Sequence, residues 1–314
     1  MPVPTRTARV PAASLTVALA LVFACTLAAT TPAAAAGSPG DLYVTSDASN
    51  IVRVYDDASG LFGGIFTSSG PASGQLAIHF GQAQGRCLIG HFGGGVEERD
   101  ASTGALIQNF APGGGWQWAG VYAPNGNVYI GSQLTNDVRV YHPVTGALLS
   151  VLCPIPGPAD MEFGPNGNLY ICSYTNYMVR EVHPITGALV SQWSLPFGER
   201  TNDIAFLNGE FLVTAMQSNV CWRFDAFHNL IGSFAGAGWQ RPHGIAIGPT
   251  DGRIYIVDGV TTQVHVFDPI TFAELNPAFL NPNPGDKIVD LAFRPEDPTP
   301  ARSASWGRLK ASYR

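Results

Sequence analysis

The chain has little charge and, after residue 36, no long apolar run. Only 13% of its 314 residues are charged, and no later apolar stretch approaches the roughly 20 residues that span a bilayer. None of the repeated apolar segments has the 3.6-residue spacing of a helical solenoid. The GxSxG, P-loop, HExxH and EF-hand patterns are also missing. Their absence removes the most direct sequence evidence for a hydrolase, a nucleotide-binding protein or a calcium sensor.

Basic residues are scarce as well, 17 against 23 acidic residues. Arg6 and Arg9 lie near the N-terminus, and four more basic residues follow residue 300, namely Arg302, Arg308, Lys310 and Arg314. The long segment between them is therefore strongly acidic. Because an acidic surface repels phosphate backbones, this balance argues against a nucleic-acid partner.

The cysteines lack metal-binding spacing. Of the five, Cys25 lies near the N-terminus, and no two of the others form a CxxC pair. The remaining four each lie in an apolar strand context in a different repeat; they are Cys87, Cys153, Cys172 and Cys221. We expect buried thiols there, with disulfides as the alternative in an oxidising compartment.

Residues 1–36 follow the order of a secretory signal peptide. Arg6 and Arg9 precede an apolar stretch at 15–29, and the alanines at 33–36 suit cleavage. A short membrane anchor and a lipoprotein modified at Cys25 are the alternatives. We expect cleavage, and therefore a protein that is secreted, periplasmic or held at the cell surface.

A repeat of about 42 residues dominates the rest of the chain. Its copies read VRVYDDASG, VEERDASTG, VRVYHPVTG, VREVHPITG, VCWRFDAFH and VHVFDPITF, starting at Val52, Val96, Val138, Val179, Val220 and Val264. Each copy lies in a unit of four short strands separated by Gly, Pro, Asn and Asp turns. Four such strands per repeat are typical of a propeller blade.

We therefore predict an all-β fold, a six-bladed β-propeller of four-stranded antiparallel blades at 37–294. The blades are expected at 41–66 with 287–294, 75–110, 116–153, 158–194, 201–234 and 242–277. The first unit lacks an innermost strand and the last unit supplies one. Pairing of the C-terminal strand with the N-terminal blade would close the ring and remove exposed sheet edges.

A Pro/Ser-rich linker (295–305) and a short basic aromatic tail (306–314) follow the propeller. The tail contains Trp306, Leu309 and Tyr313. It is either a frayed end or a docking peptide that contacts sorting machinery or an envelope surface.

Three segments resemble known propeller repeats. RPHGIAIGPTDGRIYIVDGVTTQVHVFD (241–268) is similar to an NHL repeat, and LYVTSDASNIVRVYD (42–56) resembles the YVTN repeat of surface-layer propellers. GERTNDIAFLNGEFLV (198–213) resembles the Arg-x-Asn-Asp segment of the senescence-marker/gluconolactonase family. The repeat-level resemblance covers about residues 40–296. It implies a propeller and leaves the activity open, because this fold hosts many functions.

A propeller divides its loops between two faces. His142 and His183 fall in turns between strands 3 and 4, where the other repeats have Asp, so we expect turn-forming roles. The opposite face carries the loops between strands 2 and 3 and the residues that lead into strand 1. Aromatic, amide and ionisable side chains gather there and predict a ligand pocket. Its expected contacts are His91, Trp118, Tyr174, Arg200, Asn202 and Gln217. Sealing of blade junctions is the alternative role for Trp116, Trp118 and Trp239.

The gluconolactonase resemblance implies metal and substrate ligands at the start of the innermost strands. Aligning the repeats there defines a ring position, held by Leu76, Ala119, Ala159, Asn202, His243 and Val289. Only Asn202 and His243 can bind a metal, whereas a hard divalent cation prefers several oxygen ligands that include carboxylates. One residue later come Asp160, Asp203 and Asp290, which strand alternation is expected to point elsewhere.

Two enzymatic alternatives remain open. A metal-dependent lactonase-like hydrolase would place Ca²⁺ or Mg²⁺ on Asn202, His243 and Asp258. In a lyase resembling the virginiamycin B type, His243 would be the catalytic base and Asp258 the nearby carboxylate. The preferred interpretation is a non-catalytic exported propeller without a cofactor, which binds a protein, glycan or small-molecule ligand at its mouth.

Overall fold

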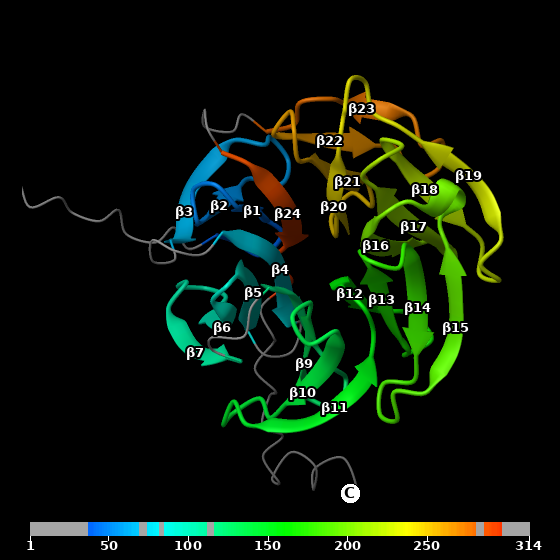
Figure 1. Cartoon of the computed structure of the whole chain (residues 1–314). Coiled ribbons are helices and arrows are strands. Elements are labelled where there is room, and N and C mark those ends of the chain that lie inside the picture. The colour runs from blue at the N-terminus through cyan, green and yellow to red at the C-terminus, as the bar shows by residue number, and fades with distance from the viewer. Residues whose placement is uncertain (1–36, 69–73, 82–84, 112–115, 281–285, 297–314) are drawn as a thin grey trace, which may run out of the picture. The chain divides into compact units, whose positions relative to one another are not determined.

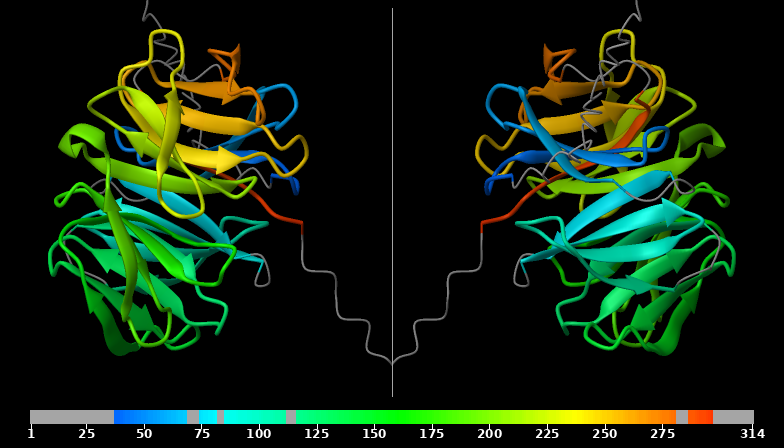
Figure 2. Two further views of the ribbon diagram at one scale, coloured as in Figure 1. Left: turned by 90° about the vertical axis from the view of Figure 1, so that its right-hand side faces the viewer. Right: turned by 90° about the vertical axis from the view of Figure 1, so that its left-hand side faces the viewer.

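The computed structural model describes residues 37–68, 74–81, 85–111, 116–280 and 286–296. Their strands form six four-stranded antiparallel blades set radially about a central axis (Figure 1), and a short antiparallel pairing joins the second and third blades into one sheet. Seen from the side, the blades stand between two opposite faces (Figure 2). The predicted six-bladed propeller is confirmed, and the expected signal peptide, most of the linker and the tail lie outside the described residues.

The blades follow one another in chain order around the axis, and the strands of each blade are named from the innermost outward. The first blade contains β24 (Ile288–Phe293), β1 (Leu42–Ser46), β2 (Ile51–Tyr55) and β3 (Phe62–Ser68). The second contains β4 (Gln75–Gly81), β5 (Arg86–Phe92), β6 (Gly95–Asp100) and β7 (Leu106–Phe110). The third contains β8 (Trp116–Tyr122), β9 (Val128–Ser132), β10 (Asp137–Tyr141) and β11 (Leu148–Pro154).

The remaining three blades repeat the same order. The fourth contains β12 (Pro158–Phe163), β13 (Leu169–Ser173), β14 (Met178–Val182) and β15 (Leu189–Ser194), and a short 3₁₀ turn, η1 (Pro196–Gly198), follows it. The fifth contains β16 (Thr201–Leu207), β17 (Glu210–Ala215), β18 (Val220–Phe224) and β19 (Leu230–Phe234). The sixth contains β20 (Pro242–Ile247), β21 (Ile254–Asp258), β22 (Gln263–Phe267) and β23 (Glu274–Asn276).

The ring closes where the prediction places the closure. β24 pairs antiparallel with β1, with Leu42 opposite Phe293 and Val44 opposite Leu291. Just before β24, Asp286 accepts two hydrogen bonds from the buried Arg53 guanidinium, at 2.7 and 3.0 Å. This two-pronged ion pair ties the C-terminal strand to the third strand of the first blade.

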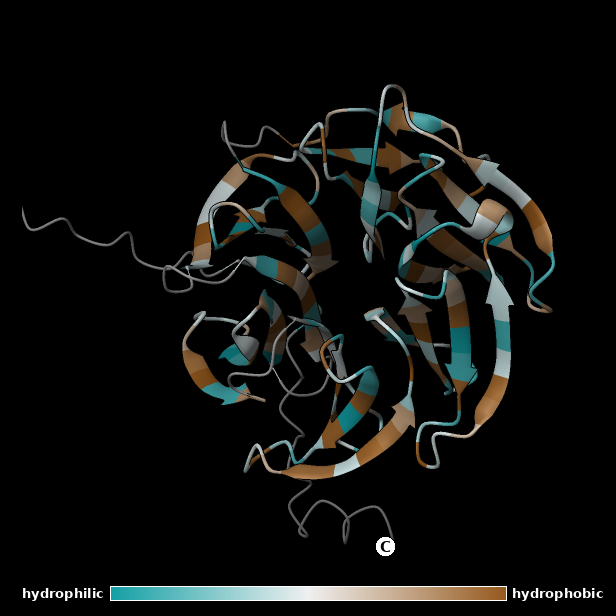
Figure 3. Ribbon diagram, viewed as in Figure 1, coloured by the Kyte–Doolittle hydropathy of each residue, from teal (hydrophilic) through white to brown (hydrophobic). Residues whose placement is uncertain are grey.

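Each junction between neighbouring blades is filled by its own apolar cluster. The junction of the third and fourth blades, for example, buries Val121, Tyr129, Met161 and Ile171. The second strands β1, β9, β13 and β21 are buried along their whole length, so each sheet presents mostly apolar side chains to both neighbours. Figure 3 shows the hydrophobic bands along the strands. No helix in the described part of the chain is long and apolar enough to cross a membrane.

The innermost strands contain an irregularity that breaks strict alternation. Where β12, β16 and β20 pair with the next strand, the register shifts between Pro158 and Met161, Thr201 and Ile204, and Pro242 and Ile245. Comparable shifts occur in the other three blades. A bulge of this kind can turn two successive side chains toward the same region.

The repeated turn motif has a structural explanation. Asp100 Oδ1 accepts the backbone N–H groups of Ser102 and Thr103, at 3.0 and 2.8 Å. In the corresponding turns, Nδ1 of His142 and of His183 accepts two backbone N–H groups at 3.2–3.3 Å. The predicted turn-forming roles of these two histidines are confirmed.

The four described cysteines are free and buried, as expected. Each of them lies in a strand. They therefore contribute to packing.

Candidate functional site

The face that carries the loops between second and third strands, here called the loop face, is organised by a repeated backbone hydrogen bond. The donor is the backbone N–H at or just after the end of the second strand. The acceptor is the backbone carbonyl two residues before the ring position, and we call that position the lead-in. The bonds run from Phe92 to Gly74, Tyr174 to Gly157, Gly259 to Arg241 and Asp47 to Lys287, at 2.8–2.9 Å. The contact fixes the backbone of both segments, and the side chains remain free to differ between blades.

These segments enclose a cavity of about 450 Å³ at the axis, which we call the mouth cavity. It is lined by Asp47, Leu76, Phe92, Trp118, Tyr174, Met216, Arg241, His243, Gly259, Val260, Lys287 and Val289. Its size suits a small molecule. Of the predicted contact residues, Trp118 and Tyr174 line it directly, and so does His243, the base or metal ligand of the enzymatic alternatives.

A cation, the Arg200 guanidinium, lies against the aromatic part of the mouth cavity. The rings of Trp118 and Tyr174 lie with centroids 5.5 Å apart. The guanidinium of Arg200 lies 4.5 Å from the Tyr174 ring centroid and donates a hydrogen bond to the phenol oxygen at 2.5 Å. Arg200 therefore orients the Tyr174 ring at the rim.

His243 is held from two sides in the wall of the cavity. Its backbone carbonyl accepts a hydrogen bond from Thr214 Oγ1 at 2.6 Å, and a Cβ added to Gly259 would lie 2.6 Å from its Cδ2. The residue is 7% exposed, and its Nδ1 is buried without a hydrogen-bond partner in the described part of the chain. Burial lowers the pKa of His243 to about 4, aided by the nearby Arg241 charge, so the imidazole is neutral at neutral pH.

The three expected metal ligands do not share one role. Asn202 is 4% exposed and lines a small void of about 10 Å³ at the axis, where its Oδ1 has no partner among the described residues. Asp258 is fully buried, and its carboxylate accepts backbone N–H groups of Gln240, Val260 and Thr261 at 2.8–3.3 Å. The carboxylate required by the metal hypothesis is thus used to hold the loop, and this donor set does not fit a divalent cation.

Two further predicted contacts lie outside the cavity wall. His91 is 1% exposed and lies opposite Gln117, where β5 pairs with β8. Its Nε2 lies 3.3 Å from a carboxylate oxygen of Glu97. Gln217 accepts a weak hydrogen bond from the Arg200 backbone at 3.4 Å. Trp239, 5% exposed, packs against His265 and Phe267 at a blade junction, as its alternative role anticipated.

The expectation that Asp160, Asp203 and Asp290 point elsewhere than the ring-position residue Asn202 is wrong. All three line the void beside Asn202, because the bulges interrupt alternation in the innermost strands. Asp203 Oδ2 accepts the Ile245 N–H at 2.7 Å, and Asp290 Oδ2 accepts the Ile78 N–H at 2.8 Å. These carboxylates link neighbouring innermost strands around the axis.

The pKa values of the ionisable groups around this void are shifted in different directions. His79 Nε2 lies 2.8 Å from Asp160 Oδ1. Burial opposes the charge on both, but their mutual attraction outweighs it, so the pKa of Asp160 is lowered and that of His79 is raised. Burial and the Asp160 charge raise the pKa of Asp203 well above its usual value, and burial raises that of Asp290 to about 7.

A second cavity of about 450 Å³ opens on the opposite face, the turn face. Its wall combines the acidic group with Glu162 and the rings of Phe80, Phe206 and Phe293. Sequence reasoning missed this cavity, although an Asp directly after the ring position in three of the six repeats was the available signal.

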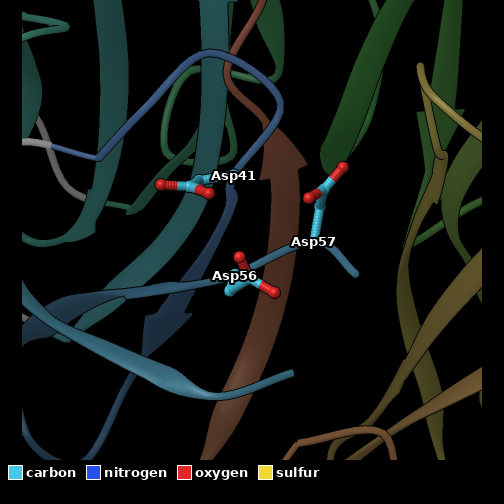
Figure 4. Close-up of side chains that lie close together, drawn as sticks. All are labelled: Asp41, Asp56 and Asp57. Atoms are coloured by element: carbon cyan, nitrogen blue, oxygen red, sulfur yellow. The ribbon is translucent and has the colours of Figure 1, made fainter. Parts of the chain in front are cut away.

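The turn face also carries three neighbouring carboxylates (Figure 4). Among the described residues, oxygens of Asp41, Asp56 and Asp57 lie within 4.8 Å of one another. Asp56 accepts the Ser59 N–H at 2.8 Å, Asp41 accepts the Ser38 N–H at 2.6 Å, and Asp57 accepts from Thr250 Oγ1 at 3.1 Å. Turn and loop contacts account for this acidic group.

No protein-family model and no curated protein matches the chain. Solved structures do resemble it. A chain of the nidogen/laminin complex superposes with a TM-score of 0.67 at 12% identity, covering 82% of this chain and 99% of that one. Catalytically inactive virginiamycin B lyase from Staphylococcus aureus, solved with quinupristin, gives 0.57 at 15%, covering 71% and 75%. A streptogramin B lyase gives 0.57 at 16%, covering 84% and 92%. At these identities the likeness shows the propeller fold alone.

Proposed function

We propose that this chain is a non-catalytic binding propeller that captures a ligand in the mouth cavity of its loop face. The observation that carries the proposal is the cavity itself. About 450 Å³ of space is bounded by aromatic rings, an apolar floor and a few polar groups at the axis. Concave sites of this size and composition are the usual binding sites of propellers and other rigid scaffolds.

The polar groups favour binding over hydrolysis. A metal-dependent lactonase needs oxygen ligands around its ion, whereas the Asp258 carboxylate is bonded to loop backbone. A general base needs a partner that orients it, and the buried Nδ1 of His243 has none among the described residues. The lactonase-like and lyase-like hypotheses therefore rank second and third.

The structural neighbours are consistent with either class. One is a propeller in a protein complex, nidogen with laminin, and another is a lyase solved with quinupristin. Because the fold hosts both kinds of function, the choice depends on the chemistry of the site. A protein or glycan that enters the same cavity remains within the proposal.

The proposed site of action is outside the cytoplasm. Residues 1–36 have the order of a secretory signal, and the segment that follows is acidic and poor in lysine. The tail at 306–314 is proposed as a docking peptide. Deleting 301–314 should change where the protein accumulates without changing its melting temperature, and unchanged placement would contradict the role of the tail.

The proposal can be tested by screening small molecules against intrinsic tryptophan fluorescence of the protein without residues 1–36. Tyr174→Ala should abolish binding of any compound that enters the cavity. Tyr177→Ala is the matched control, because Tyr177 lies in the same loop and outside the cavity lining. A divalent-dependent lactone hydrolysis that disappears in His243→Ala would contradict the binding proposal and support the enzymatic alternative.

A further inference from the structure

Aromatic rings line one part of the mouth cavity, and basic side chains line another. The position after the second strand supplies aromatic rings in the second and fourth blades, Phe92 and Tyr174, and Trp118 of the third blade lies beside them. The lead-in position supplies the other side. From the second blade onward around the ring, it holds Gly74, Gln117, Gly157, Arg200, Arg241 and Lys287. The three cations therefore belong to three adjacent blades, the fifth, the sixth and the first.

The fold does not require a cation at the lead-in position. Gly74 and Gly157 make the same backbone hydrogen bond there as Arg241 and Lys287 do, with matching lengths of 2.8–2.9 Å. The contact uses only the carbonyl, so the hydrogen bond itself does not call for a cation. The repeated backbone contact therefore does not explain cations in three consecutive blades, two of which, Arg241 and Lys287, line the cavity.

These cations also differ from most of the propeller's other basic residues. Arg180 and Arg294 bond to backbone carbonyls, of Pro154 and Gly37 respectively. Six arginines elsewhere in the propeller have a carboxylate within 4.0 Å: Arg53, Arg86, Arg99, Arg139, Arg223 and Arg253. No such partner exists for Arg200, Arg241 or Lys287 within the described segments. Arg241 and Lys287 are exposed at the cavity rim.

Two acids near the rim are held by other groups, and a third lines the cavity. Asp258 is fully buried and bonded to backbone, and Glu199, 4% exposed, accepts hydrogen bonds from the Ser218 backbone and hydroxyl. Asp47 is the one carboxylate in the cavity lining. Burial raises its pKa, and the charges of Lys287 and Arg241 oppose that rise.

From this arrangement we infer that the mouth cavity selects an organic carboxylate with a flat apolar body, which stacks on Trp118 and Tyr174 and directs its charge to Arg241 and Lys287. The inference rests on the proposed binding function and adds the class of ligand. Arginine presents a planar fork that matches a carboxylate, and lysine adds a point charge beside it. His243 lies in the same wall and adds an imidazole to it.

The test compares two probes of the same shape, 2-naphthoate and the neutral 2-naphthamide, by quenching of tryptophan fluorescence in low salt. We expect 2-naphthoate to bind at least tenfold more tightly than 2-naphthamide, since hydrogen bonds to charged partners exceed neutral ones by about that factor. Raising the salt concentration to 0.5 M should weaken only the naphthoate, because screening acts on the charge interaction.

Charge variants locate the effect. Arg241→Gln and Lys287→Gln should each weaken naphthoate binding about fivefold to tenfold and leave naphthamide unchanged. Asp47→Asn should strengthen naphthoate binding. The matched control is Arg253→Gln, which removes the same charge from the opposite face.

The outcomes separate the two proposals. Equal binding of naphthoate and naphthamide, or an equal loss in Arg253→Gln, would overturn the carboxylate inference while the binding function stands. If neither probe binds and the compound screen also fails, both the inference and the binding function are overturned.

Discussion

Acid should stabilise this protein, because the carboxylates at its axis bind protons more tightly in the folded state. Asp290 is the sharpest case. Burial beside Asp160 raises its pKa from 3.8 to about 7. A carboxyl group with a raised pKa contributes stability that is present below its unfolded pKa and is lost as pH rises through the folded value.

The magnitude follows from the size of the shift. A rise from 3.8 to about 7 corresponds to about 4 kcal/mol of unfolding free energy. Part of this is already lost by pH 5, where the unfolded Asp290 is ionised, so roughly 2 to 3 kcal/mol should disappear between pH 5 and pH 8. The raised pKa values of Asp203 and His79 act in the same direction, whereas the lowered pKa of Asp160 matters only below about pH 4.

Urea unfolding, followed by tryptophan fluorescence at pH 5, 6, 7 and 8, measures this effect. In Asp290→Asn the amide oxygen can still accept the Ile78 N–H, but the group no longer titrates. We expect the variant to lose about 2 to 3 kcal/mol less than the wild type between pH 5 and pH 8. The exposed Glu296→Gln serves as control and should keep the wild-type slope. Identical slopes for wild type and Asp290→Asn would refute the reasoning.

Three other outcomes follow from the described contacts. Asp286→Ala should lower the unfolding free energy by about 3 kcal/mol, measured in urea, because it deprives the buried Arg53 of its two-pronged partner. Gly259→Ala should weaken 2-naphthoate binding several-fold in fluorescence titrations, since the new methyl displaces the His243 imidazole. An aromatic disulfide reagent should leave all four thiols unmodified until urea is added, because they are buried, and burial raises the pKa of Cys153 to about 11.

The blades were predictable from sequence because each is specified locally. Alternating residues such as those around Val138 define a strand, and the following Asp or His binds turn N–H groups within three residues. The closure by β24 was also predictable, since one repeat lacked a strand and another had one to spare. These inferences need only the period and the count of the repeat.

The site was predicted less completely. Loop position correctly brought Trp118, Tyr174 and His243 to one cavity, and it placed Gln217 beside Arg200. His91 lies instead where β5 pairs with β8, and the repeat pattern does not predict this contact between blades. The axial carboxylates were misplaced for a different reason: a bulge is a feature of backbone geometry, and strict alternation cannot reveal it.

Residues that recur in a repeat and residues that depart from it carry different information. His142 and His183 hold a position that Asp fills in other blades, and their ring nitrogens do the same turn-forming work. His243 stands where the other blades have Leu, Ala, Asn or Val, and no packing rule of the propeller requires an imidazole there. The lead-in cations depart from Gly and Gln in the same way. Because the scaffold is satisfied by the recurring residues, the departures that converge on one cavity are the groups available for selecting a ligand.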